Sequence, residues 1–142
     1  MINKAVLDQK GFTLIEIMIA IVIFSIGMLG IARLQMIATE GNSFARKMSE
    51  AANIGQDRTE EALSMEYDFY IDTNGNGAAG SGLNDTGAGA DYSFALSGYT
   101  ININVSEDFP ITNTKTIRII TTWPQKGSIR QSSVDYIKFD HI

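Results

Sequence analysis

The stretch "KGFTLIEIMIAIVIFSIGMLG", residues 10–30, decides the fold of this 142-residue chain. From Phe12 to Ala32 the only charged residue is Glu16. At about 1.5 Å per residue, a helix over this run is roughly 30 Å long, the thickness of the hydrocarbon core of a bilayer. A cleaved secretory signal fits less well, because its apolar part is usually about 7–15 residues long and is followed by small residues at the cleavage site. We therefore expect residues 12–32 to span a membrane.

Glu16 is the residue in this run that needs a partner. A carboxylate in hydrocarbon is costly unless it is neutralised or paired, so it is a functional candidate by default. No basic residue lies one helical turn away, and we expect the partner to come from outside the helix. A cut between Gly11 and Phe12 would create an α-amino group four residues from Glu16. In a bundle of identical helices, that amine can meet the Glu16 of a neighbour.

The helical pattern continues beyond the apolar run. Apolar and small residues recur at alternating spacings of three and four, which places them on one face of a helix; they are Leu34, Ile37, Gly41, Phe44, Met48, Ala51 and Gly55. We predict one helix from about Thr13 to about Glu66, apolar all round over 12–32 and amphipathic over 33–66. Gly27 and Gly30 are helix-packing candidates, because small residues permit close approach of helices in membranes.

Composition excludes several classes of function. The net charge is −5, and without a basic stripe we predict no nucleic-acid binding. The chain has no cysteine, which excludes a disulfide scaffold and a thiolate metal site. The sole histidine, His141, lies next to the C-terminus, so a catalytic triad is not expected. Lysines and arginines occur on both sides of the apolar run, so the charge rule leaves its orientation open.

A Gly/Asn-rich loop, residues 72–91, opens the globular part, residues 67–142. Asp72, Asn74 and Asn76 match the first half of a calcium loop, in which oxygen ligands at alternate positions surround the ion. The twelfth position holds Leu83 in place of the bidentate glutamate. Asp85 or Asp91 could complete a divergent site, but a plain turn cluster is the simpler interpretation. We commit to no metal or other cofactor, with calcium as the open alternative.

Alternating patterns predict strands in the rest of the chain. A half-buried strand is predicted over 99–106, a second over 117–123, and a short one over 92–96. In the last strand the apolar phase slips between Tyr136 and Ile137, which predicts a bulge. The segments 107–114 and 124–127 would connect the strands. The expected fold is α+β, with three or four antiparallel strands covering the amphipathic helix half, and with Trp123 and the tyrosines in the core.

The run Lys10-Gly11-Phe12-Thr13-Leu14-Ile15-Glu16, followed by about twenty apolar residues, resembles the class III signal of type IV pilins and type II secretion pseudopilins. The resemblance implies that a prepilin peptidase cuts after Gly11 and that Phe12 becomes the N-methylated first residue. It implies that the leader, residues 1–11, is cytoplasmic, with Lys10 as its usual basic residue. Glu16 would then pair with the amino group of a neighbouring subunit during assembly.

Within this superfamily, residues 20–35, "AIVIFSIGMLGIARLQ", are similar to minor pilins of the PilV type, which act in pilus assembly or modification. The resemblance implies a structural protein and no enzyme, with other pilin subunits and the inner-membrane pilus assembly platform as partners. Its location would be the inner membrane, then a surface pilus or a periplasmic pseudopilus. A type II secretion pseudopilin is an alternative. A permanently anchored single-pass protein with an exported ligand- or calcium-binding domain is another.

Overall fold

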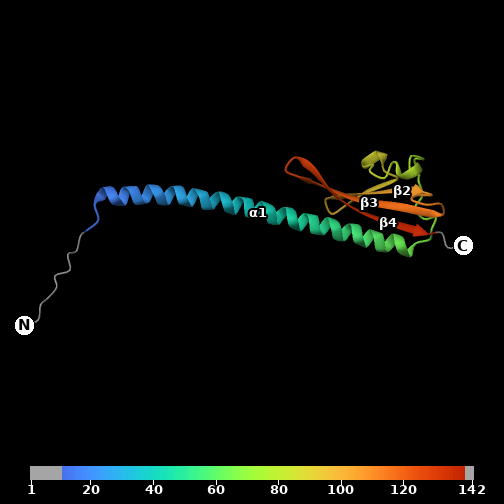
Figure 1. Cartoon of the computed structure of the whole chain (residues 1–142), viewed down its shortest axis with the longest axis horizontal. Coiled ribbons are helices and arrows are strands. Elements are labelled where there is room, and N and C mark those ends of the chain that lie inside the picture. The colour runs from blue at the N-terminus through green and yellow to red at the C-terminus, as the bar shows by residue number, and fades with distance from the viewer. Residues whose placement is uncertain (1–10, 140–142) are drawn as a thin grey trace, which may run out of the picture. The chain divides into compact units, whose positions relative to one another are not determined.

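The computed structural model describes residues 11–139. A single long helix, α1 (Leu14–Ser64), precedes two short 3-10 turns, η1 (Ala78–Gly80) and η2 (Gly87–Gly89). Four strands follow, β1 (Tyr92–Leu96), β2 (Tyr99–Glu107), β3 (Thr114–Gln125) and β4 (Ser128–Phe139) (Figure 1). The predicted α+β architecture is therefore confirmed. By its internal contacts the chain divides into two units, which meet within α1 between Asn42 and Ser43.

The first unit contains the apolar half of α1. The helix begins at Leu14 and ends at Ser64, within two residues of the predicted bounds. An 18-residue window near its N-terminus has a mean hydropathy of 2.6, and none of it is buried in the structure. By length and composition this segment is able to cross a membrane. The leader up to Lys10, and His141 at the other end of the chain, lie outside the described residues.

The second unit contains the sheet, in which the strands follow one another in the order β1-β2-β3-β4, all antiparallel. Ser97-Gly98 and Lys126-Gly127 form its two tight hairpin turns, with positive φ at both residues of each pair, as two-residue hairpins favour. Pro124 pairs with Ile129, so the connection predicted at 124–127 is shorter than expected and its first two residues belong to β3.

The predicted bulge in the last strand is wrong. The β3–β4 register runs without interruption from Thr114↔Phe139 to Gln125↔Ser128. Ile137 and Phe139 alternate with Lys138 along β4, and their side chains are 44% and 55% exposed. The position between them is Lys138, whose ammonium donates to the Ala62 carbonyl on α1. The alternation of apolar residues is broken because Lys138 faces the helix at this position. The backbone pairing of β3 and β4 stays regular.

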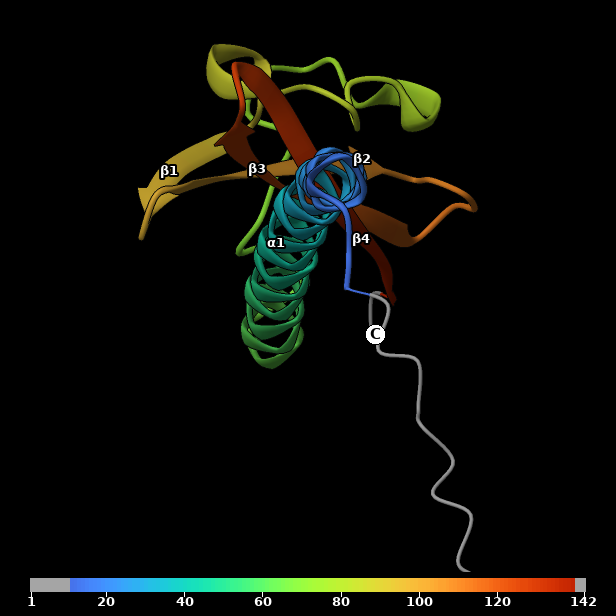
Figure 2. The ribbon, with the colours of Figure 1, turned by 90° about the vertical axis from the view of Figure 1, so that its left-hand side faces the viewer.

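The core of this unit lies between residues 43–64 of α1 and one face of the sheet (Figure 2). Ala51, Gly55 and Ala62 are the buried positions of the helix. A methyl group on Gly55 would stand 3.3 Å from Val134 Cγ2, so the glycine allows β4 to approach closely. The sheet contributes mainly β-branched and aromatic side chains to this core: Tyr99, Ile101, Ile103, Val105, Ile117, Ile119 and Trp123. The predicted core role of Trp123 is confirmed.

Both faces of β2 are buried, so the prediction of a half-buried strand is wrong. Asn102 and Asn104 are each 1% exposed although they face away from α1. Loop 72–91 covers this second face (Figures 1 and 2). Asn104 Nδ2 donates to the carbonyls of Leu83 and Asp85, at 3.0 and 2.9 Å, and Asn102 Oδ1 accepts the Gly87 N–H. The polar residues of β2 are thus the anchors of the loop, and they do not face solvent.

Two lysines hold the C-terminal end of α1 and the turn after it. Lys115 and Lys138 are direct partners across β3 and β4. Lys115 is 1% exposed, and its ammonium donates to the carbonyls of Tyr67 and Tyr70 at 3.1 and 2.9 Å. Lys138 donates to the carbonyls of Ala62 and Met65. Cations are favoured at this end of a helix, where the last carbonyls have no partner within it.

Candidate functional site

The predicted cleavage position lies just outside the helix. Gly11 and Phe12 precede the first helical residue, Leu14, and both are exposed. The side chain of Phe12 is 82% exposed. A methyl group on Gly11 would find no atom within 4 Å. The peptide bond between these two residues is therefore accessible and free of helical hydrogen bonding, as a protease substrate requires.

Glu16 has a partner within its own segment. The backbone N–H and the hydroxyl of Thr13 both donate to Glu16 Oε2 at 3.2 Å, and the Glu16 N–H donates to Thr13 Oγ1 at 3.3 Å. This reciprocal arrangement is a capping box, which satisfies free N–H groups at a helix N-terminus. These hydrogen bonds come from neutral groups, so the expectation that a charged partner for Glu16 comes from outside the helix stays a prediction. The pattern Thr-x-x-Glu before an apolar run was the signal that sequence reasoning missed.

The capping box leaves the charge of Glu16 unmatched. Both contacts from Thr13 reach the same oxygen, Oε2, and they come from neutral groups. Oε1 makes no hydrogen bond within the part of the chain that the structure describes, and no lysine or arginine there lies within ion-pair distance of the carboxylate. The N-terminal end of a helix favours a negative charge. One oxygen thus remains available to a donor from another molecule.

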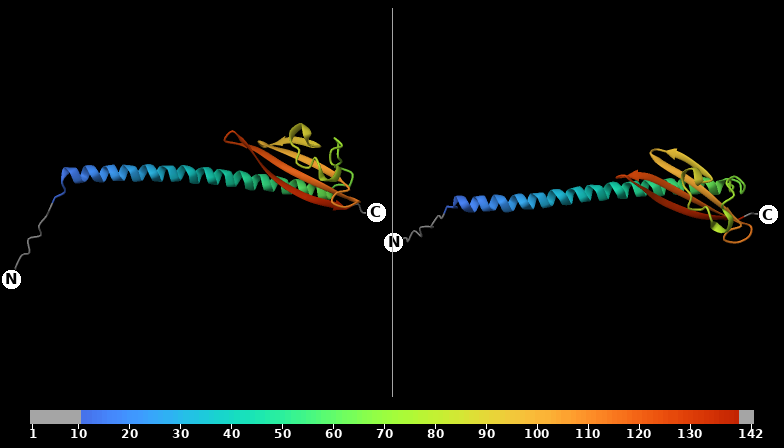
Figure 3. Two further views of the ribbon diagram at one scale, coloured as in Figure 1. Left: turned by 45° about the horizontal axis from the view of Figure 1, so that its top comes forward. Right: turned by 90° about the horizontal axis from the view of Figure 1, so that it is seen from above.

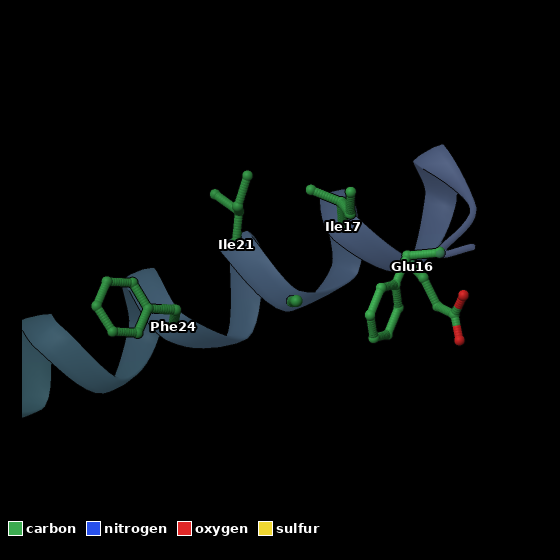
Figure 4. Close-up of a pocket in the computed structure, with 6 residues that line it drawn as sticks. Glu16, Ile17, Ile21 and Phe24 are labelled. Carbon is green, nitrogen blue, oxygen red and sulfur yellow. The ribbon is translucent and has the colours of Figure 1, made fainter. Parts of the chain in front are cut away.

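The surface beside Glu16 is a shallow apolar groove along the helix. Figure 4 shows Ile17 and Ile21 on one side of the helix and the Glu16 carboxylate on another, near the helix start. Phe12 and Phe24 also line the groove. These apolar side chains are more than half exposed, and exposed apolar surface costs about 25 cal/mol per Å² in water. This half of α1 needs lipid or other helices around it.

Gly27 and Gly30 lie on the same apolar half of α1. A methyl group at either position would meet no atom within 4 Å, so no contact within the chain requires a glycine there. Residues three apart lie on the same side of a helix. Their predicted role in close helix–helix packing concerns other subunits, and it stays a prediction.

The structure brings the predicted calcium-loop residues together, but it occupies many of their oxygens. Asp72 accepts the N–H groups of Gly75 and Gly77 at 2.7 and 2.8 Å. Asn74 Oδ1 accepts the N–H of Asn76, whose side-chain amide donates to Asp85 Oδ2 at 2.7 Å. Such contacts between side chains and nearby backbone stabilise turns. These contacts hold the residues of the loop together.

Asp91 ties this loop to the sheet. Its Oδ1 accepts the Thr73 N–H and its Oδ2 accepts the Val105 N–H, both at 2.8 Å. The second bond satisfies β2 beyond the last residue that pairs with β1. Over residues 11–139, no group of three or more histidine, cysteine, aspartate or glutamate side chains is arranged to hold a metal ion. Calcium binding by Asp72, Asn74 and Asn76, completed by Asp85 or Asp91, stays a prediction.

Comparison with known families identifies the N-terminal segment. Residues 7–32 match the family model of the prokaryotic N-terminal methylation motif. Comparisons with curated proteins and with solved structures each found no match. The matched segment contains the accessible Gly11-Phe12 bond, Glu16 and most of the apolar half of α1. The match supports a type IV pilin-like protein, and a signal of this type implies processing by a prepilin peptidase and assembly into a pilus or pseudopilus.

Proposed function

We propose that this chain is a minor pilin, similar to the PilV type, which acts in assembly or modification of a type IV pilus. The observation that supports this role most is the site at the start of α1. An accessible Gly11-Phe12 bond stands directly before a helix that carries one carboxylate, Glu16, on an otherwise apolar and fully exposed half. Cleavage uses the accessible bond, membrane insertion uses the apolar half of the helix, and helix bundling uses the carboxylate.

The proposed maturation proceeds in two chemical steps. The prepilin peptidase hydrolyses the amide bond between Gly11 and Phe12, which releases the leader and exposes the α-amino group of Phe12. That amine, in its neutral form, then takes the methyl group of a methyl donor, and the resulting secondary amine binds a proton and is a cation. In a bundle of parallel helices it lies near the Glu16 of a neighbouring subunit, where Oε1 is available. The ion pair neutralises a carboxylate that hydrocarbon disfavours and fixes the register between subunits.

The first experiment is the intact mass and N-terminal sequence of the protein from membranes and from sheared filaments. We expect a chain that begins with methylated Phe12 in both fractions. Gly11→Ala should leave uncut precursor in the membrane. An uncut wild-type chain confined to membranes would overturn the proposal in favour of a permanently anchored protein.

The charge of Glu16 can be separated from its capping role. Glu16→Gln keeps a side chain that can complete the capping box but removes the charge, whereas Glu16→Ala removes both. We expect both variants to be cut normally, and both to enter filaments several-fold less than wild type. Normal incorporation of Glu16→Gln would show that the carboxylate serves only as a cap.

Two more distinctions belong to this proposal. Fractionation separates a pilus from a pseudopilus, because a pilin is recovered from sheared surface filaments and a pseudopilin stays with the cell envelope. Calcium binding by loop 72–91 is tested by calorimetry of the purified chain with calcium chloride, with Asp72→Asn as the control. No heat at millimolar calcium would remove that part of the proposal.

A further inference from the structure

The hairpin between β3 and β4 extends past the rest of the sheet. β2 pairs with β3 only as far as Thr122, whereas β3 and β4 continue to pair up to Gln125 and Ser128. We call residues 125–130 the hairpin tip (Figure 3). Ile129 in this tip is 78% exposed, more than any other large apolar side chain that the structure describes in the second unit. An isoleucine that protrudes so far is a candidate anchor for another surface.

An apolar groove of about 470 Å³ lies at the opposite end of the same unit. The end of α1 and the turn after it contribute Leu63, Met65, Glu66 and Tyr67, and β4 contributes Ile137 and Phe139. Leu63 and Phe139 are each 55% exposed. The remaining lining residue, Lys138, turns its ammonium toward the carbonyls of Ala62 and Met65. We call this surface the terminal groove.

The two ends carry opposite charge. At the tip end, Arg130 stands beside Ile129, with its guanidinium 5.9 Å from the ring of Phe44, and Arg46 and Lys47 lie on the adjoining turn of α1. Glu66 lines the terminal groove. Asp68 and Glu107 lie near it, 3.9 and 3.5 Å from the ammonium of Lys115, which is the cross-strand partner of Lys138. Lys115 offsets part of the charge of Asp68 and Glu107, and Glu66 makes no ion pair within the described residues. The tip thus presents an exposed isoleucine beside a cation, Arg130, and the groove presents apolar side chains beside a carboxylate, Glu66.

We propose that the hairpin tip of one copy docks in the terminal groove of a second copy, with Ile129 on the apolar floor and Arg130 facing Glu66. The two patches differ, so the contact is head-to-tail and leaves a free tip and a free groove at the ends. Contacts of this type continue into open filaments when they do not close into a ring. The helices of all copies can then point in the same direction.

This docking rests on the proposed function, because the contact is stable only when the helices of the copies are bundled. One isoleucine and one ion pair cover far less than the roughly 1,000 Å² expected of a stable interface. Bundled helices raise the local concentration of the two patches and turn a weak contact into a lasting one. From Ile129 to Ile137 and Phe139 is eight to ten residues of β4, or about 26–33 Å at 3.3 Å per residue. Successive copies would be offset by a distance of this order.

The chain has no cysteine, so paired cysteines test the docking directly in membranes and in filaments. The double variant Ile129→Cys with Leu63→Cys should give a ladder of dimers, trimers and longer species on oxidation. A mixture of the two single variants should stop at dimers, and each single variant alone should stay monomeric. Ala95→Cys on the exposed strand β1, combined with Leu63→Cys, is the matched control and should give no ladder. A dimer from Ile129→Cys alone would show a symmetric contact and overturn the proposal.

Charge reversal adds a second readout. Arg130→Glu in the double-cysteine chain should weaken the ladder about fivefold, which corresponds to roughly 1 kcal/mol, and Glu66→Arg in the same chain should restore it. No effect of Arg130→Glu would overturn the assigned orientation.

The mass of each cross-linked chain separates this inference from the proposed function. A processed chain in filaments without the ladder overturns the docking and keeps the function. An uncut chain that forms the ladder in membranes keeps the docking and overturns the function. An uncut chain without a ladder overturns both.

Discussion

Replacing Lys115 by methionine tests whether the buried lysine holds the end of α1 against the sheet. Its ammonium donates to the carbonyls of Tyr67 and Tyr70 and lies 4.4 Å from the centre of the Tyr67 ring. Its nearest carboxylate oxygens are on Glu107 at 3.5 Å and Asp68 at 3.9 Å. Methionine has a similar length and keeps the apolar packing of the stem, so the variant removes mainly the polar contacts.

The expected cost comes from the two carbonyls that lose their donor. A buried polar group without a partner costs about 1–3 kcal/mol, and the two together cost about 2–6 kcal/mol. Loss of the cation–π contact adds about 0.5–2 kcal/mol. Relief from burying an ammonium offsets several kcal/mol of this. We expect a net destabilisation of about 3 kcal/mol.

Urea unfolding of the full chain in detergent measures this cost, because the chain has one tryptophan and Trp123 is 2% exposed in the sheet core. With an m-value of about 1.5 kcal/mol per M, the fluorescence midpoint should fall by about 2 M urea. Arg46→Met, which removes an exposed cation from α1, should change stability by less than about 0.5 kcal/mol. Equal midpoints for Lys115→Met and Arg46→Met would refute the reasoning.

Three further predictions concern the second unit. Burial, with a smaller effect of Tyr70, raises the pKa of the Tyr136 hydroxyl above 10.0, so the unfolded chain loses this proton first and stability falls as pH rises above about 10. Tyr136→Phe removes a buried hydroxyl that has no hydrogen-bond partner among residues 11–139, and should move alkaline unfolding, followed by Trp123 fluorescence, to higher pH. An unmoved midpoint would rule out this titration. Gly77→Ala would place a methyl group 2.2 Å from the Val105 carbonyl oxygen and should lower the unfolding free energy by about 1–3 kcal/mol, whereas Gly41→Ala, with open space, should not lower it. Removal of residues 1–35 should give a soluble monomer in sedimentation experiments, and an aggregate would mean that the sheet leaves the remaining helix face uncovered.

Local sequence patterns were enough to predict most of the candidate site. Residues 10–16 and the apolar run that follows specify where the helix starts and place Glu16 in its first turn, because both depend on neighbours within four residues. The capping box of Thr13 and Glu16 is just as local, and it was readable from the Thr-x-x-Glu spacing. The second helix half and the four-stranded meander follow from periods of 3.6 and 2, which the backbone geometry imposes.

By itself, the sequence determined the long helix, its change from apolar to amphipathic, and the alternating strands. Only the tertiary structure decided which polar residues are buried, because that depends on segments far apart in the chain. Asn102 and Asn104 face a loop that folds back over β2, and Lys115 and Lys138 reach carbonyls of α1 and the turn after it more than 40 residues away. A polar side chain in a strand is usually predicted to face solvent. The alternation of residues along a strand shows which face a side chain takes, but it does not show what covers that face. The same reason explains why the predicted bulge in β4 was wrong. Lys138 takes a position that faces the end of α1, so the alternation of apolar residues is broken there while the hydrogen-bonded register stays regular.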